Sequence, residues 1–235
     1  MKKILIALIF VVGAVAGVGV WAHVKNLSGG DLVAIGKGMV KSRVERHSVE
    51  ERVAAIVAKK PGLKAVAESA GGSLTIRVFK NERRVEVAAP GWKTASRVYE
   101  MTAFSGRLGP KLREGDGQIP EGIYGIEYLN PNSLYHLSLK VSYPNAEERA
   151  RAKKEGRTNL GGDIMIHGRN VSVGCVAIGD EAIEEVFYLV NAVGCKNVKV
   201  IIAPYDLRKG RQGVLEKSDL AWYPDLCRQL ENALR

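Results

Sequence analysis

A histidine and a cysteine eight positions apart offer the clearest chemistry in this sequence. An apolar stretch ends in His167, and the run Ser-Val-Gly-Cys ends at Cys175. Nucleophilic catalysis by a thiol needs a nearby base and backbone N–H groups directed at the developing oxyanion. Histidine is the side chain whose ordinary pKa suits proton transfer near neutral pH. The spacing therefore predicts Cys175 as a nucleophile. His167 is predicted to exchange its proton, or to pair with the thiolate as an imidazolium that lowers the thiol pKa.

Several neighbours of this pair are candidates for supporting roles. We expect the N–H groups of Gly174 and of the nucleophile to be oxyanion donors, because a Gly lets the main chain approach a carbonyl closely. Ser172 is expected to hydrogen-bond the loop or to orient the histidine, unless it is only a turn residue. Gly168 and Arg169 are candidate substrate-binding residues. Arg169 could bind a carboxylate through two parallel hydrogen bonds, or it could be a solvated loop residue.

A second histidine lies on a strand expected over residues 134–143. Leu137, Leu139 and Val141 occupy its apolar face, which places His136 on the polar face. There it would line a substrate groove, or it would be a solvated strand residue. No HExxH, Cys-x-x-Cys or close set of four zinc ligands occurs in the chain, so neither a metal site nor a cofactor is expected.

The apolar periodicities place these residues in a β-rich α+β domain. A two-residue period predicts a hairpin over residues 73–87, and further strands are expected over 97–104, 122–128, 134–143, 163–166 and 198–203. Because these strands are not each followed by a helix, the pattern argues against a doubly wound parallel sheet. After the cysteine, Gly179-Asp180 is expected to begin a helix that packs on the sheet and holds the cysteine loop. Its apolar residues follow helical spacing: Ile183, Val186, Phe187 and Val190.

Helices are also expected on either side of the strands. Ser48 and Glu51 form a capping-box pattern before a helix that ends at Pro61, and a second short helix follows. The tail contains a short amphipathic helix near Leu226 and Leu230. Residues 147–157 are a dense run of mixed charge, which is typical of a solvated helix or loop; the alternative is a lid over a groove that accepts anionic peptides.

The charge balance indicates the kind of partner. The net charge of +10 favours an anionic partner. Aromatic residues make up only 6% of the chain, too few for the stacking platforms of nucleic-acid-binding proteins, and no nucleic-acid motif is present. Nucleic acid is therefore disfavoured, and cell-envelope polymers rich in carboxylate or phosphate are favoured.

The N-terminal segment indicates export. Lys2 and Lys3 precede an uncharged apolar stretch from Ile4 to Trp21, which is typical of an export signal and near the minimum length of a membrane span. We expect the domain to lie in the periplasm or cell envelope, with residues 1–24 either cleaved or kept as an inner-membrane anchor.

The three cysteines leave at least one thiol unpaired in an oxidising compartment. A disulfide between Cys195 and Cys227 would leave Cys175 as the reactive thiol. The equally weighted alternative is that Cys195 and Cys227 are small packing residues.

The His-Gly and Ser-x-Gly-Cys pattern resembles the catalytic signature of the L,D-transpeptidase (YkuD-type) family. Residues 115–122 are similar to that family's Pro-x-Gly segment before a core strand, and residues 129–133 and 143–145 resemble a proteobacterial branch. The resemblance covers residues 73–205. Two positions depart from the family pattern: Val173 stands where members typically carry a second His, and Ala177 where they carry a polar residue.

The resemblance implies a YkuD-type β-sandwich or curled mixed sheet, with a helix after the catalytic cysteine. It places a catalytic domain over 73–205, after a linker and helical lead-in over 25–72 and before a tail over 206–235. The implied activity is an L,D-transpeptidase that acts through a cysteine thioester on diaminopimelate-containing peptidoglycan stems, in cell-wall biogenesis and cell shape. The acceptor would be the amine of another stem or a lipoprotein lysine. Two alternatives stay open: a hydrolase of the same linkages that also releases peptidoglycan-bound lipoprotein, and a catalytically silent envelope-binding domain.

Overall fold

The computed structural model describes residues 46–92, 96–210 and 220–235. The expected export segment and most of the expected linker, residues 1–45, lie outside these ranges. Within them, no helix combines the length and the apolar character that crossing a membrane requires.

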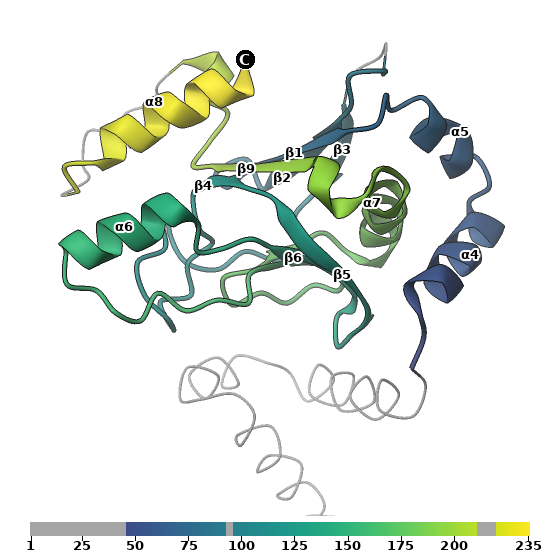
Figure 1. Ribbon diagram of the computed structural model, residues 1–235, viewed down its shortest axis with the longest axis horizontal. Coiled ribbons are helices and arrows are strands. Elements are labelled where there is room, and N and C mark those ends of the chain that lie inside the picture. The colour runs from purple at the N-terminus through teal and green to yellow at the C-terminus, as the bar shows by residue number, and fades with distance from the viewer. Residues whose placement is uncertain (1–45, 93–95, 211–219) are drawn as a thin grey trace, which may run out of the picture. The chain divides into compact units, whose positions relative to one another are not determined.

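Two mixed sheets form the centre of the fold (Figure 1). The strands of the first are β1 (Leu74–Phe79), β2 (Arg84–Ala88), β3 (Arg97–Glu100), β4 (Gly122–Tyr124) and β9 (Val198–Ala203). Those of the second are β5 (Ile126–Ser133), β6 (His136–Val141), β7 (Met165–His167) and β8 (Val176–Ala177). The strand orders are β3-β2-β1-β9-β4 and β5-β6-β7-β8, and the pairs β1–β9 and β7–β8 are parallel. The α+β class expected from the sequence is confirmed.

Five α-helices surround the sheets in the described ranges. They are α4 (Val49–Lys59), α5 (Leu63–Glu68), α6 (Ala146–Lys154), α7 (Asp180–Val193) and α8 (Tyr223–Leu234); two short 3₁₀ turns, η1 (Cys195–Asn197) and η2 (Leu207–Lys209), flank β9. The predicted capping box begins α4: the Ser48 hydroxyl accepts from the Glu51 N–H, and the Glu51 carboxylate accepts from the Ser48 N–H.

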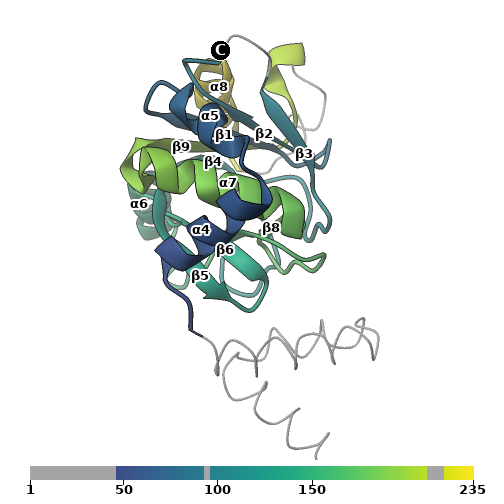
Figure 2. The ribbon, with the colours of Figure 1, turned by 90° about the vertical axis from the view of Figure 1, so that its right-hand side faces the viewer.

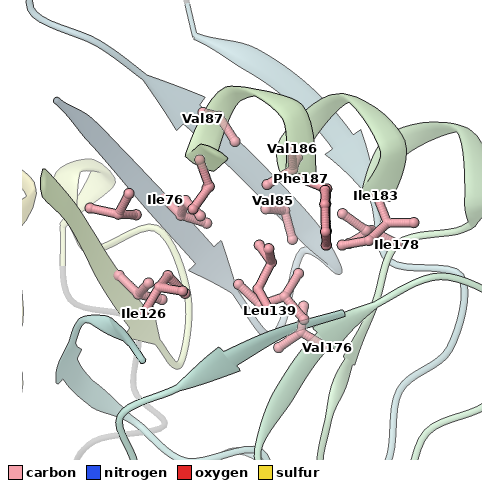
Figure 3. Close-up of a cluster of buried hydrophobic side chains, with 14 of the residues drawn as sticks. Ile76, Val85, Val87, Ile126, Leu139, Val176, Ile178, Ile183, Val186 and Phe187 are labelled. Atoms are coloured by element: carbon pink, nitrogen blue, oxygen red, sulfur yellow. The ribbon is translucent and has the colours of Figure 1, made fainter. Parts of the chain in front are cut away.

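The main core lies between the two sheets and α7 (Figure 3). Ile183, Val186 and Phe187 of α7 are fully buried, as their helical spacing predicts. They pack with Val85 of the first sheet and Leu139 of the second. The helices α4 and α5 lie along α7 (Figure 2), and both contact it. The helix that follows β8 is thus packed on both sides, which anchors the C-terminal end of that strand.

A second apolar cluster joins α8 to the first sheet. Leu226 and Leu230 of α8 are buried against Phe79 of β1 and Ile201 of β9. Cys227 belongs to this cluster.

Cys195 packs instead against the main core. The two cysteines therefore lie in different clusters, and no disulfide joins them. The disulfide alternative is wrong, and the packing alternative describes both residues.

Two predicted strands differ from the observed ones. The strand expected over 122–128 is divided at Gly125, because β4 pairs with β9 of the first sheet whereas β5 pairs with β6 of the second. Gly125 is held at this crossing by Ser142, whose hydroxyl accepts from the Gly125 N–H at 2.8 Å. The strand expected over 97–104 ends at Glu100. The irregular segment that follows, residues 101–119, contributes to the site described next.

Candidate active site

The predicted nucleophile and base lie on neighbouring parallel strands. His167 ends β7 and pairs with Ala177 of β8, and Cys175 lies two residues before Ala177. Cys175 directly precedes β8, and because side chains alternate along a strand, the register places it diagonally from His167 on the same face. On the adjacent strand β6, Ser138 pairs with His167 and Lys140 with Met165.

The hydrogen bond of His167 determines which ring nitrogen is available. Its side chain is buried, and Nδ1 lies 2.6 Å from the Gly168 carbonyl oxygen. A carbonyl only accepts, so Nδ1 carries the proton and Nε2 has the free lone pair. Burial lowers the pKa of His167, and the hydrogen bond to Gly168 only partly opposes this. His167 is therefore a neutral imidazole at pH 7, suited to accept a proton at Nε2.

The thiol of Cys175 is also neutral at rest. Its Sγ lies 3.5 Å from the Asp163 carbonyl oxygen, a donor–acceptor pair that requires the thiol proton. Burial raises the thiol pKa; a hydrogen bond from the Met165 backbone and the charge of Lys140 oppose the rise without cancelling it. Because burial disfavours both charged forms, it favours the other predicted reading, proton transfer from Cys175 to His167, over an imidazolium–thiolate pair at rest.

Tyr135 lies near both predicted catalytic residues. Its ring lies 4.7 Å from that of His167, centroid to centroid, at an interplanar angle of 34°. Burial raises the pKa of Tyr135, and the negative charge of Cys175 in its thiolate form adds to the rise, so the phenol lies near that sulfur. No spacing in the sequence indicates this residue, because it belongs to the turn between β5 and β6.

Two serines fix the turn that carries the nucleophile. The Ser172 hydroxyl donates to the Cys175 carbonyl at 2.7 Å. The Gly174 N–H donates to the Ser105 hydroxyl at 2.6 Å, and Ser105 in turn donates to the Gly117 carbonyl at 2.9 Å. Ser172 thus holds the loop, as one of its predicted roles has it. The prediction that the Gly174 N–H is an oxyanion donor is wrong, because this N–H donates to Ser105 instead.

Gly174 is required for a different reason. Its φ is +92°, and a Cβ there would lie 3.0 Å from the Gln118 carbonyl oxygen. The segment that approaches it is itself held by Asp116, whose carboxylate accepts from the Gln118 N–H at 3.0 Å and from the Lys111 ammonium at 2.6 Å. A side chain at position 174 would therefore displace one wall of the site.

The two predicted substrate-binding residues after His167 have clear backbone roles. A Cβ on Gly168 would lie 2.6 Å from the Asp180 carboxylate and 2.8 Å from the Tyr135 carbonyl oxygen, so only Gly fits. The Arg169 N–H donates to Asp180 at 2.7 Å, and its guanidinium lies 3.8 Å from the same carboxylate, 41% exposed. Gly168 therefore has a packing role. The guanidinium of Arg169 is partly exposed, which is compatible with binding a substrate carboxylate and with a solvated loop residue.

The imidazole of His136 is engaged by α7, although its Cβ lies close to Gly168 beside the site. Its φ is +73°, next to an irregular register between β5 and β6, and its Nε2 lies 3.0 Å from a carboxylate oxygen of Glu184 on α7. The turn reverses the direction of the side chain toward α7. The residues of this strand's predicted polar face that lie at the site are Ser138 and Lys140, and both are buried.

Across the described ranges, no three His, Cys, Asp or Glu side chains are grouped so that they could hold a metal ion.

Comparisons with known proteins bear on the family and the fold. The sequence profile of the YkuD family, described as the L,D-transpeptidase catalytic domain, matches residues 73–202. An Escherichia coli protein described as "Putative L,D-transpeptidase YafK" is 34% identical over 142 residues, which are 57% of this chain and 55% of that protein. The chain thus spans about half the length of the curated relatives it matches.

Solved structures show more distant likeness. The helical cell shape determining protein Pgp2 from Campylobacter jejuni is 23% identical, with a TM-score of 0.44 over 63% of this chain and 56% of that one. L,D-transpeptidase 1 from Mycobacterium tuberculosis is 15% identical, with a TM-score of 0.31 over 56% of this chain and 62% of that one.

Proposed function

Because the chain belongs to the YkuD family of L,D-transpeptidase catalytic domains, we propose that it is a cysteine acyltransferase acting on peptidoglycan stem peptides. The observation that carries the proposal is the shared face of β7 and β8, where a neutral His167 and a neutral Cys175 are diagonal neighbours beside Tyr135. This pair supports general-base activation of a thiol, the step that an acyl transfer through a thioester requires.

In the first half-reaction, Nε2 of His167 takes the thiol proton as Cys175 Sγ attacks the carbonyl carbon of the diaminopimelate residue. A C–S bond forms, and the negative charge moves to the carbonyl oxygen. Collapse of this intermediate breaks the C–N bond to the terminal D-alanine, whose amine takes the proton back from His167. The enzyme is left with a thioester on Cys175 and a neutral imidazole.

The oxyanion needs donors other than Gly174, whose N–H is bonded to Ser105. We assign the role to the backbone N–H of Cys175, with the ammonium of Lys140 as a nearby positive charge. One backbone donor of this kind is typically worth about 10²–10³-fold in rate. Lys140 lies opposite Met165 on the adjacent strand and lowers the pKa of the Cys175 thiol, so its charge acts where the negative charge develops.

The second half-reaction decides between transferase and hydrolase. An amine from another stem, or from a lipoprotein lysine, would attack the thioester and give a new amide; water would give a free carboxylate. Val173, half exposed beside the nucleophile, supplies no second base for the incoming amine. His167, neutral again after the first half-reaction, is the base that we assign to the acceptor. The family membership favours an amine, and water is the competing acceptor.

Product analysis tests this assignment. Purified disaccharide tetrapeptide is incubated with the protein and excess D-methionine in H₂¹⁸O, and products are read by mass spectrometry. We expect a stem in which D-methionine replaces D-alanine, and none of it with Cys175→Ala. A tripeptide carrying one ¹⁸O would instead establish the hydrolase, and an unchanged stem would favour a silent binding domain.

The localisation is part of the same proposal. A substrate of peptidoglycan lies outside the cytoplasmic membrane, and the N-terminal pattern of two lysines and an uncharged apolar stretch is typical of export. We place the catalytic domain in the periplasm or cell envelope on these grounds.

A further inference from the structure

An open groove of about 770 Å³ lies between α6 and the loop that leads from it toward Asp163. Gly161 and Gly162 of that loop line the groove, and the next residue, Asp163, accepts a hydrogen bond from the Cys175 thiol. The loop then continues through Ile164 into β7. The groove therefore ends within two residues of the atoms that contact the nucleophile.

The groove is lined by more positive than negative charge. Arg149, Lys153 and Arg157 line it, with Glu114 as the only acidic residue among the lining residues. Arg157 is already paired with Glu155 at 2.6 Å. In the described part of the chain, neither Arg149 nor Lys153 forms an ion pair; the Arg149 guanidinium donates to the Pro144 carbonyl.

The acidic residues of α6 have closer partners than Arg149 and Lys153, although burial raises the pKa of Glu148 and the charge of Arg149 still opposes that rise. Glu147 pairs with Arg151 at 2.6 Å, and the buried Glu148 accepts from the Tyr124 hydroxyl at 2.6 Å. Arg151 itself lies over the Trp222 ring, on the α8 side of the helix. The mixed charges of this run thus separate in space, with neutralised pairs toward α8 and free cations toward the groove.

Arg149 and Lys153 are also four residues apart on one helix. Like charges at this spacing destabilise an isolated helix by a few tenths of a kcal/mol, and a bound anion would remove that repulsion. The last turn of a helix favours any cation, which would explain Lys153 without a ligand. Lys154 is in the same turn but does not line the groove. A comparison of Lys153 with Lys154 therefore distinguishes a ligand-binding role from a preference of the helix end for cations.

We propose that this groove binds the free carboxylates of the stem peptide and so places its carbonyl at Cys175. The inference rests on the proposed function for the identity of the peptide. The carboxylates would lie against Lys153 and Arg149, while the peptide follows the loop past Asp163 to the thiol. This substrate-binding role differs from the lid alternative for residues 147–157, because α6 forms a wall of the groove rather than a cover.

Binding to the full-length Cys175→Ala protein tests the inference without turnover. A synthetic tetrapeptide stem with free carboxylates is titrated calorimetrically at 0.15 M salt, and so is the same peptide with the carboxylates upstream of the scissile bond amidated. Lys153→Glu is compared with Lys154→Glu, which makes the same charge change one residue away. We expect Lys153→Glu to raise the Kd for the free peptide about fivefold, since it removes one attraction and adds one repulsion. Lys154→Glu should leave the Kd nearly unchanged.

The Kd of the amidated peptide for the Cys175→Ala protein should match the Kd of the free peptide for the Lys153→Glu variant. The amidated peptide should bind Lys153→Glu and Lys154→Glu with the same Kd. The inference would be overturned if Lys153→Glu and Lys154→Glu had equal Kd values for the free peptide. It would also be overturned if Lys153→Glu weakened binding of the amidated peptide as much as that of the free one, or if the free peptide did not bind. If the Kd pattern holds while the wild-type protein makes no Cys175-dependent product, the groove stands and the proposed chemistry fails.

Discussion

Replacing His167 with Gln is expected to lower kcat for the stem peptide by roughly 10²–10⁴-fold, the usual contribution of a positioned general base. The effect is large because burial keeps the Cys175 thiol protonated at rest, so the reaction needs an acceptor for that proton. Gln can still donate to the Gly168 carbonyl, which Nδ1 of His167 contacts at 2.6 Å, and it has no basic nitrogen. Steady-state kinetics should show the loss in kcat with little change in KM.

The pH dependence separates this role from a structural one. Burial lowers the pKa of His167, so the basic form predominates above a pH that lies below 6.5. The wild-type kcat/KM should therefore rise with pH along a limb centred below 6.5 and then stay level through neutrality. In His167→Gln the residual rate depends on the thiolate. Because the thiol pKa is raised from its ordinary value, that rate should rise only in the alkaline range.

A matched substitution controls for the loss of an imidazole as such. His47 precedes α4, where its N–H donates to Asn132 and its imidazole lies 3.6 Å from the Glu51 carboxylate, so His47→Gln should keep the wild-type pH profile. A His167→Gln enzyme with the wild-type acid limb would contradict the base assignment. So would a His167→Gln enzyme within a few-fold of the wild-type kcat.

Replacing Glu121 with Gln is expected to lower the free energy of unfolding by about 3–5 kcal/mol, the usual cost of breaking a buried ion pair from one side. The Lys80 ammonium donates to the Glu121 carboxylate at 2.8 Å and to the carbonyl oxygens of Gly109 and Ile119, and both charged side chains are wholly buried. The second carboxylate oxygen accepts from the Tyr223 hydroxyl at 2.5 Å. Burial lowers the pKa of Lys80 and the charge of Glu121 opposes it, so the variant leaves a buried cation without its counter-charge.

This network joins three parts of the fold that the site depends on. Lys80 follows β1, Glu121 precedes β4, and Tyr223 begins α8. Between Gly109 and Ile119 the chain carries Gly117, the acceptor for Ser105. Urea unfolding, followed by circular dichroism, measures the effect.

Glu147→Gln is the matched control, since it makes the same change in a surface pair with Arg151 at 2.6 Å. It should cost less than about 1 kcal/mol. If the two variants lost equal stability, the buried pair would not have the importance assigned to it.

Much of this fold follows from short-range patterns in the sequence. The apolar period of Ile183, Val186 and Phe187 predicts the buried face of α7, and Ser48 with Glu51 predicts the start of α4; both are confirmed. Such patterns are local, because the spacing of side chains along an element decides which face is buried. The division of residues 122–133 between two sheets is not local. It depends on β6, which follows directly along the chain, and on β9, which comes much later.

The site divides in the same way. Cys175 and His167 are close in sequence, so their chemistry and spacing identify them as candidates. Ser105 lies 69 residues from Gly174, which it binds, and Tyr135 reaches the site from a turn. Neither has a neighbouring pattern that marks it.

His136 shows the opposite failure. Strand alternation placed it on the polar face, but a positive φ turned its side chain to Glu184. Lys140 lies on the same predicted face, four residues after His136. Strand alternation could have identified it as the residue near the site.

The central claim is that a thioester forms on Cys175, and trapping it is the most direct measurement. The protein is mixed with the tetrapeptide stem, quenched in acid within milliseconds to seconds, digested and read by mass spectrometry. We predict that the peptide containing Cys175 gains the mass of the stem acyl group without D-alanine, and that hydroxylamine removes it. Cys175→Ala should give neither adduct nor product. Product formation by Cys175→Ala, or an acyl adduct on any other residue, would contradict the account.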